Sequence, residues 1–406
     1  MAIIVQKYGG SSVADADKIK NVARRAIRAE SAGNQVVVVV SAMGKTTDEL
    51  IKLARGIEEN PDEREMDVLL STGEIVSSTL LAMALRSMGA KAISLNGAQA
   101  GIKTDSVFSR ARILNINPRR ITGELDKGKI VIVAGFQGIT DEMDVTTLGR
   151  GGSDTTAVAL AVSLGAERCE IYTDVDGVYT SDPRMVPESR RLESIGYEEM
   201  LELATYGARV MHNRAVELGG VYNMPILVAS SFNDNPGTLI CGGNPVEVAN
   251  KVRGIAHDVN VAKVTVVGVP DKPGIACAIF EPLAKAGISV DTIVQNASID
   301  RVTDLTFTVA KSDMHKAMKV IEPVARSVGA RECSTDTKLA KVSVVGAGIQ
   351  SAPGYAARMF RALYDEGINI ELITTSEIRI TCIIDEARVG DAMRTLHKAF
   401  ELEQGV

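Results

Sequence analysis

The chain has 406 residues, of which 45% are hydrophobic and 24% are charged, with a formal net charge of −6 and no tryptophan. This length predicts two or three domains that each bury a core, and the composition excludes a disordered chain and makes nucleic acid a poor partner. The five cysteines are scattered without a CxxC pair, which excludes a disulfide scaffold and a structural zinc site. With no secretory signal and no apolar run of roughly 18 residues, the sequence favours a cytoplasmic protein without a membrane span.

Strand-like and helix-like patterns alternate through the first part of the chain. Continuous apolar runs predict strands at residues 3–6, 36–40, 130–134 and 170–172, and helical spacing predicts helices at residues 17–29 and 153–164. This alternation predicts an α/β domain built on a mostly parallel sheet. In such sheets ligands bind beyond the carboxyl ends of the strands, so we expect the chemistry in the loops that follow strands.

The first such loop, Lys7-Tyr8-Gly9-Gly10-Ser11-Ser12, directly follows the first predicted strand. Its two glycines let backbone N–H groups come close to a bound anion, and Lys7 adds a positive charge at the end of the strand. The alternative is an ordinary glycine turn beside a surface lysine. The pattern favours the anion site.

A second loop leads its glycines into a predicted helix, at Arg150-Gly151-Gly152-Ser153-Asp154. The free N–H groups of residues 151–153 lie at the positive end of that helix, which suits an anion, and the planar guanidinium of Arg150 suits a carboxylate. Asp154 either caps the helix or takes part in the chemistry, and its spacing favours neither. A third loop, residues 173–184, is long and polar, which indicates a functional loop rather than a hairpin.

An internal repeat follows a stretch rich in Gly, Pro and Asn at residues 235–244. Residues 271–296 and 351–376 align at an offset of 80, and each copy has a strand pattern before it and a strand and a helix after it. The pattern of one copy predicts the order βαββα. At about 70 residues one copy is too small to be stable by itself, so we expect the two sheets to lie side by side. The pair is either only a dimerisation module or a site for a small anion or amino acid. Pro273 and Pro353, each in a Pro-Gly loop that opens a helix, favour the site.

Five motifs taken together resemble those of the aspartokinase family: KYGGSS at residues 7–12, VSAMGKTTD at 40–48, STGE at 71–74, RGGSD at 150–154 and TDVDGVYTSDPR at 173–184. The tandem repeat resembles the paired ACT domains of that family. The resemblance implies an α/β fold. An amino acid kinase-type, mostly parallel sheet sandwiched by helices would span residues 1–245, and two ferredoxin-like βαββα ACT repeats would span residues 263–338 and 339–406.

The resemblance implies transfer of the γ-phosphoryl group of MgATP to the side-chain carboxylate of L-aspartate. The product, 4-phospho-L-aspartate, would start lysine, threonine and methionine biosynthesis. A carboxylate acceptor is already ionised at pH 7 and needs no general base, so the four histidines (His212, His257, His315 and His397) are interpreted as structural. ATP and Mg²⁺ are the implied cofactors, with Mg²⁺ held mainly by ATP phosphates and by no direct protein ligand. The alternatives are N-acetylglutamate or a related carboxylate as acceptor, an amino-acid sensor with a degenerate kinase part, and a pure scaffold.

The resemblance also implies roles for individual residues. Lys7 would neutralise the transferring phosphoryl group, and Asp154 would orient Lys7 or the phosphates. Arg150 would bind the α-carboxylate of aspartate, and Glu74 would pair with its ammonium group. The expected ATP-binding residues are Lys7, Tyr8, Gly9, Gly10, Ser11, Ser41, Thr173, Asp174, Tyr179, Thr180, Ser181, Asp182, Pro183 and Arg184. The expected aspartate-binding residues are Thr47, Glu74, Arg150, Gly151, Gly152 and Ser153.

The ACT repeats imply feedback inhibition by lysine, threonine or both. The expected effector-binding residues are Asp271, Ala276, Ser289, Val290, Asp291 and Gln295 in the first repeat, and Tyr355, Ala356, Asn369, Ile370, Ser376 and Glu377 in the second. The resemblance leaves the assembly open between a homo-oligomer formed through the ACT domains and a heterotetramer with a short ACT-only subunit. No methionine lies between Met224 and Met314, so such a subunit would need a non-AUG start, for example at Val246, Val248 or Val252.

Overall fold

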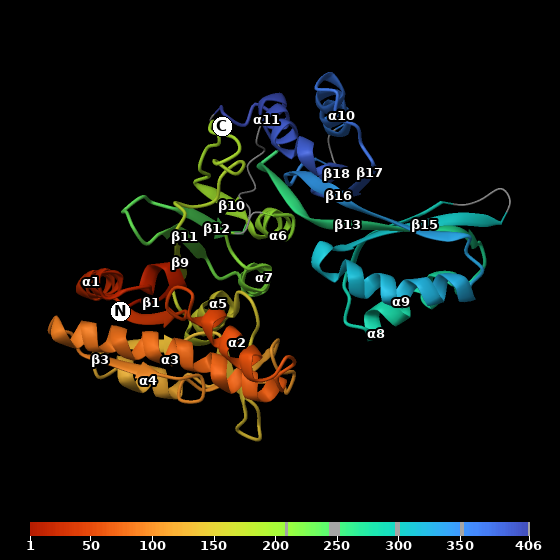
Figure 1. Ribbon diagram of the computed structural model, residues 1–406. Coiled ribbons are helices and arrows are strands. Elements are labelled where there is room, and N and C mark those ends of the chain that lie inside the picture. The colour runs from red at the N-terminus through yellow and green to blue at the C-terminus, as the bar shows by residue number, and fades with distance from the viewer. Residues whose placement is uncertain (208–209, 243–251, 297–300, 350–352, 405–406) are drawn as a thin grey trace. The chain divides into compact units, whose positions relative to one another are not determined.

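The chain folds into two compact units, and residues 180–190 belong to the second unit although they lie within the sequence of the first. The computed structural model describes residues 1–207, 210–242, 252–296, 301–349 and 353–404. The first unit comprises Met1–Tyr179 and Arg191–Glu247, and the second comprises Thr180–Arg190 and Val248–Val406. Figure 1 labels elements of both units where there is room. We expected a first domain of residues 1–245, and this expectation did not separate residues 180–190 from it.

The first unit is built on an eight-stranded sheet in the order β10-β12-β11-β9-β1-β2-β6-β3. The six strands from β11 to β3 run parallel to one another, which confirms the predicted mostly parallel sheet. The strands are β1 (Ile3–Tyr8), β2 (Gln35–Val40), β3 (Ala92–Leu95), β6 (Ile130–Ala134), β9 (Arg168–Thr173), β10 (Ser194–Gly196), β11 (Ile226–Ser230) and β12 (Thr238–Cys241).

Helices cover both faces of this sheet. On one face α1 (Ala16–Ser31) and α3 (Glu63–Ser87) pack against a core that includes Tyr8 and the even-numbered valines of β2. On the other face lies α5 (Gly152–Leu164), whose residues 152–161 are all buried. A four-stranded sheet, β5-β4-β7-β8 (Ile113–Ile116, Ile102–Thr104, Gln137–Ile139 and Val145–Thr147), and the helices α2 (Thr46–Ile57), α4 (Arg119–Leu125), α6 (Tyr197–Thr205) and α7 (Asn213–Tyr222) complete the unit.

One described helix, α3, passes a test of length and apolar composition for a membrane span. Half of its apolar window is buried inside the protein, a property that core helices share. All five cysteines are free thiols.

The second unit is built on a six-stranded sheet in the order β14-β15-β13-β16-β18-β17. The first repeat supplies β13 (Gly254–Pro270), β14 (Val290–Gln295) and β15 (Val302–Ala310), with the helices α8 (Ile275–Lys285) and α9 (Met314–Ser327). The second repeat supplies β16 (Glu332–Val345), β17 (Leu372–Ser376) and β18 (Arg379–Asp385), with α10 (Tyr355–Asp365) and α11 (Val389–Ala399). The predicted βαββα order and the side-by-side sheets are both confirmed.

The two long strands β13 and β16 join the repeats into one sheet. The first part of β13, from Gly254 to Asp258, pairs antiparallel with the end of β16, whereas its later part pairs with the start of β16. Each long strand therefore adds a fourth strand to the sheet of the other repeat. Two register shifts between Asp258 and Lys263 mark the crossover, since a β-bulge lets a strand bend from one sheet into the next.

Candidate active site

The loops at the carboxyl edge of the parallel sheet are bound to one another through their backbones. Gly9 N–H donates to Tyr172 O (3.2 Å), and Ser41 N–H donates to Tyr8 O (3.1 Å). These bonds extend the strand pairing by one residue and bring the ends of β9, β1 and β2 together. The chemistry-bearing loops predicted after the strands therefore share one edge, as expected for a parallel α/β sheet.

Lys7 and Asp154 form an ion pair at this edge. Consecutive strand residues point to opposite faces, so Tyr8 enters the core under α1 and α3 while Lys7 points toward the start of α5. The Lys7 Nζ to Asp154 Oδ1 distance is 2.6 Å, and each side chain is 11% exposed. The N-cap residue of the helix is Gly151, and no side chain caps it, so Asp154 does not cap the helix and its part in the chemistry stays a prediction.

Two glycines are required by close approach. A Cβ on Gly10 would lie 2.7 Å from Ala42 O, and one on Gly151, whose φ is +67°, would lie 2.2 Å from Cγ of His212. Gly151, Gly152 and Ser153 open α5 at its positive end, but the N–H group of Gly152, which was predicted to be free, donates to Gly149 O at 3.0 Å. Arg150 is exposed and makes no ion pair or hydrogen bond within the described part of the chain.

Glu74 is buried on α3 beside the loop that follows β2. Its Oε1 accepts from Ala42 N–H at 3.0 Å, while Oε2 is buried and has no hydrogen-bond partner among the described residues. Burial raises the pKa of Glu74 to about 7, because the charged carboxylate loses its hydration. A buried carboxyl oxygen without a partner is suited to a cationic ligand group.

Other predicted residues of the loops after β1 and β2 have different environments. Ser41 and Thr47 are half-buried, and Ser77 on α3 donates to Ser41 O at 2.8 Å. Tyr8 is completely buried, and its ring stacks on Tyr172 with centroids 4.9 Å apart. Tyr8 therefore serves the core through its side chain, and only its backbone lies at the edge.

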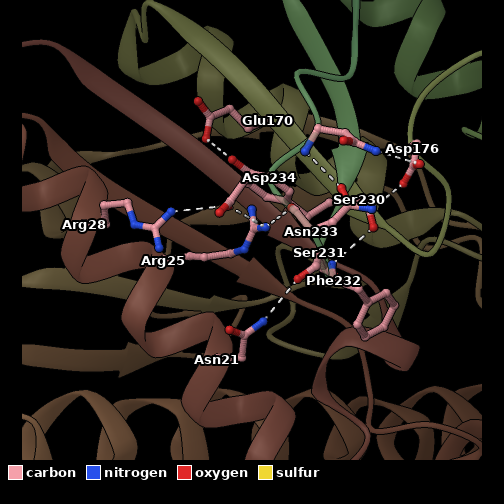
Figure 2. A network of polar contacts seen from close by, with 12 residues as sticks. Asn21, Arg25, Arg28, Glu170, Asp176, Ser230, Ser231, Phe232, Asn233 and Asp234 are labelled. Carbon is pink, nitrogen blue, oxygen red and sulfur yellow. Dashed lines mark hydrogen bonds and ion pairs between the residues drawn. The ribbon is translucent and has the colours of Figure 1, made fainter. Parts of the chain in front are cut away.

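A polar network missed by the sequence analysis fixes the loop after β11. Arg25 and Arg28 on α1 each contact Asp234 at 3.2 Å, and Asn233 and Asn235 donate to the two carboxylate oxygens of Asp176 at 2.7 and 2.8 Å (Figure 2). Asp176 belongs to the predicted nucleotide loop, so this network holds the stretch that begins at Thr173 and Asp174. The run of Asn and Asp after an apolar strand was the available signal.

The second part of the predicted nucleotide loop lies in the second unit. Thr180 is buried, and its Oγ1 lies 3.0 Å from Nε2 of His397 and accepts from Arg190 N–H at 3.0 Å. Arg184 forms a forked ion pair with Asp182, with a shortest distance of 2.7 Å, which lowers the pKa of Asp182. Ser181 is also buried, so Thr180 and Ser181 are parts of the packing of this unit.

The predicted effector residues separate into those at a cavity and those elsewhere. A cavity of about 530 Å³ beside the start of α10 is lined by Tyr355, Ala356, Ser376 and Glu377 among others. Asp291 instead forms an ion pair with the buried Lys341 of the second repeat, and Lys263 of the first repeat pairs in the same way with Glu371 of the second at 3.0 Å. The remaining predicted residues, Asp271, Ala276, Ser289, Val290, Gln295, Asn369 and Ile370, are exposed or half-buried.

Comparisons with known proteins agree with this architecture. Residues 2–230 match the model of the amino acid kinase family, and residues 264–323 and 342–400 each match an ACT domain model. The chain is 51% identical to an aspartokinase of Corynebacterium glutamicum over 408 residues, which cover 99% of this chain and 97% of that protein.

Solved structures extend the likeness. Aspartokinase III of E. coli in complex with aspartate and ADP superposes with a TM-score of 0.82 at 26% identity, over 98% of this chain and 99% of that one. The same enzyme in complex with lysine and aspartate gives a TM-score of 0.76 at 26% identity, over the same shares of the two chains. The chain therefore belongs to the aspartokinases, the aspartate kinases of the amino acid kinase family that carry ACT domains.

Proposed function

We propose that this chain transfers the γ-phosphoryl group of MgATP to the side-chain carboxylate of L-aspartate through the carboxyl edge of its first unit. The observation that carries the proposal is the ion pair of Lys7 and Asp154 beside the open α5 N-terminus and Arg150. The bound aspartate and ADP of the E. coli relative support the same pair of substrates.

The main obstacle to this reaction is repulsion between two anions. Two unit charges 4 Å apart interact by about 4 kcal/mol at an effective dielectric of 20. Lys7, the α5 amides and Arg150 supply positive charge at this edge without a proton transfer, since the acceptor carboxylate is already ionised. The site thus lowers the barrier by positioning and charge compensation.

Individual roles follow from these environments. Lys7 neutralises the transferring group, Asp154 orients Lys7, and the loop at Gly9, Gly10 and Ser11 binds phosphate oxygens. On the acceptor side, the free guanidinium of Arg150 binds the α-carboxylate, and Glu74 Oε2 accepts from the ammonium group, with Thr47 and Ser41 beside it.

Adenine and ribose are assigned to Thr173, Asp174 and Tyr179, where the network around Asp176 holds the loop. Thr180 to Arg184 remain predicted nucleotide-binding residues. Magnesium in kinases binds through substrate phosphates with one or two carboxylates. Here Asp154 is already paired with Lys7, so Mg²⁺ would be held mainly by the ATP phosphates, whose charge it would neutralise.

The experiment is ADP release with MgATP and a panel of carboxylates. We expect release with L-aspartate and none with N-acetylglutamate, and loss of release when EDTA removes Mg²⁺. Release of ADP with N-acetylglutamate but not with L-aspartate would show that the chain phosphorylates a different acceptor. No release with any acceptor, despite ATP binding, would favour the amino-acid sensor.

We also propose feedback inhibition by lysine, threonine or both at the cavity beside α10. The N-terminus of α10 has no side-chain cap, so its N–H groups suit an α-carboxylate, and Glu377 suits an ammonium group. The lysine complex of the E. coli relative supports lysine as one effector. Rates at fixed MgATP and aspartate, measured against lysine and threonine separately and together, test this, and a flat rate with no binding would refute it.

Place in metabolism and assembly complete the proposal. The product would enter lysine, threonine and methionine biosynthesis in the cytoplasm, where the five free thiols would stay reduced. Assembly is proposed through the ACT domains, either as a homo-oligomer or with a short ACT-only subunit. Native mass spectrometry of the protein from its own gene, read against variants at Val246, Val248 and Val252, distinguishes the two.

A further inference from the structure

The start of α7 contacts the glycine loop at residues 148–154 through two residues that the reaction itself does not require. His212 is the N-cap residue of α7, and its Nδ1 accepts from Arg214 N–H at 3.3 Å. The same histidine lies against Gly151, where a Cβ would be 2.2 Å from its Cγ. Its backbone N–H points to Oδ2 of Asp154 at 3.4 Å. His212 is thus tied to both ends of the segment that carries the α5 amides.

Arg214 binds the other end of the loop. Its Nη1 donates to Leu148 O at 2.7 Å, and its Nη2 donates to Ala111 O at 3.0 Å. Ala111 is in turn bound to the strand before the loop, since its N–H donates to Thr147 O at 2.9 Å. The two prongs of one guanidinium therefore hold the loop entrance against a neighbouring segment, which a single-point ammonium cannot do.

The position of Arg214 costs its guanidinium group part of its hydration. The side chain is half-buried, and no carboxylate lies within ion-pair distance of it among the described residues. Burial and the neighbouring Arg112 lower the pKa of Arg214. The half-buried guanidinium gives up part of its hydration for contacts with carbonyl groups, and Asp105 and Glu217 offset this only from beyond ion-pair distance.

We propose that His212 and Arg214 are positioning residues for phosphoryl transfer, which together hold the loop at residues 148–154 in its productive conformation. Arg214 fixes the entrance at Leu148, and His212 fixes the left-handed turn at Gly151. Arg150 lies between Leu148 and Gly151, and the α5 amides of Gly152 and Ser153 lie between Gly151 and Asp154, which His212 contacts at both ends. Because displacement of a reacting group by about 1 Å can cost about 100-fold in rate, the two contacts set how well aspartate is bound and aligned. The inference rests on the proposed function.

The first test compares Arg214→Met and Arg214→Lys with Val221→Ala, an exposed change on the same helix. Arg214→Met is expected to lower kcat/KM for aspartate about 100-fold, with a raised KM for aspartate and a KM for ATP within threefold of the parent. Arg214→Lys keeps the charge but has one nitrogen in place of the planar fork, so it should recover part of the loss. Val221→Ala should behave as the parent. A lower kcat with both KM values unchanged would indicate a smaller folded fraction, and it would overturn the inference.

The second test uses the contact of His212 with Gly151, where we expect a smaller loss of activity than at Arg214. His212→Asn keeps a capping side chain for α7 but removes the ring, so thermal stability should stay near that of the parent while kcat/KM for aspartate falls about tenfold. Gly151→Ala should be the more damaging single change, and Gly151→Ala combined with His212→Gly should recover part of it, since both the ring and the Cβ of His212, which a Cβ at position 151 would meet at 2.2 and 2.3 Å, are then removed. Parent-like kinetics of both His212→Asn and Arg214→Met would overturn the inference.

Failure of the inference is distinguishable from failure of the proposed function. If the parent protein releases no ADP with aspartate, the proposed function fails before any variant is compared. If the parent is active and the two positioning variants keep its kinetic constants, only the inference fails.

Discussion

The motif from Thr173 to Arg184 is continuous in the sequence, but its two parts are held in different units. The first part follows β9 and is fixed inside the first unit by Asn233 and Asn235 on Asp176 (Figure 2). The second part is fixed inside the second unit, where Thr180 contacts His397 and Val186 enters the core of the second ACT repeat. Two separate sets of packing contacts, one in each unit, therefore hold a single sequence motif.

The two parts of the motif therefore depend on different surroundings. Asp182 and Arg184 belong to the segment that is packed in the second unit through Thr180 and Val186. Lys7, Asp154 and Glu74 are held by the sheet and helices of the first unit alone. Changes in the first unit should thus affect chemistry and aspartate binding most, whereas changes around Thr180 should affect nucleotide binding modestly.

Loss of Lys7 should have the largest effect of any single change. Lys7→Ala removes the cation nearest the proposed transfer, so we expect kcat to fall by about 1,000-fold, the scale seen when one group that stabilises the transition state is lost. Steady-state ADP release measures it. Lys103→Ala, which removes an exposed ion pair with Asp141 in the same unit, is the control and should keep full activity.

A second variant separates chemistry from stability at this pair. Lys7→Ala leaves Asp154 buried without its partner, which also costs stability. Lys7→Met combined with Asp154→Asn removes both charges, so its melting temperature should return toward that of the parent while activity stays lost. An active double variant would contradict the assignment of Lys7.

Arg150→Ala should have the next largest effect, confined to the acceptor. Arg150 has no partner in the described residues, so its loss should leave the fold intact and raise the KM for aspartate by about 30- to 100-fold, as for a lost charged hydrogen bond of about 2–3 kcal/mol. The KM for ATP should change little. Equal increases in both constants would show that Arg150 does not select aspartate.

The folds of the two units and some of the site residues were predictable from the sequence. The valine run of β2, the first helix and the offset of 80 between the repeats indicated the sheet and the ACT pair, because apolar periodicity records burial directly. Lys7 was predicted as a site residue because it lies at the end of a strand beside two glycines, whereas Asp154 was assigned a role only through the resemblance of its RGGSD motif to the aspartokinase family. These are local properties that a sequence records.

The unit to which a loop belongs is set by tertiary contacts. Nothing in the polar run at residues 180–190 indicates that Thr180 contacts His397, more than 200 residues later. The Lys341 partner of Asp291 and the inward ring of Tyr8 were missed for the same reason: both depend on how strands lie next to one another.

Glu74 gives a pH dependence that is specific to the first unit. Its pKa is about 7 in the free protein, and pairing with the ammonium group requires the ionised form. The KM for aspartate should therefore fall about tenfold from pH 6 to pH 8, and Glu74→Gln should raise this KM and remove its pH dependence. An unchanged pH profile in Glu74→Gln would contradict the pairing.

The same group has the opposite effect on the stability of the free protein. The pKa of Glu74 is higher in the folded state than the ordinary value of 4.5, so the folded state binds the proton more tightly. Its contribution to stability is present below about pH 4.5 and is lost as pH rises toward 7. Thermal melts of Glu74→Gln should lack this loss, and aspartate should reverse part of it in the parent.

The smallest effect is expected at Thr180, and it tests the second part of the motif. Thr180→Val removes the hydroxyl that contacts His397 and accepts from Arg190 N–H, so it should destabilise the protein by about 1–2 kcal/mol. Because Asp182 and Arg184 follow directly, the KM for ATP should rise a few-fold while the KM for aspartate stays constant. Thr265→Val, which removes a hydroxyl contact with Thr306 in the same unit, should cost similar stability and leave both constants unchanged. If the two variants have the same KM for ATP, the packing of residues 180–190 in the second unit does not affect nucleotide binding. The boundary between the two units after Tyr179 would then have no functional consequence.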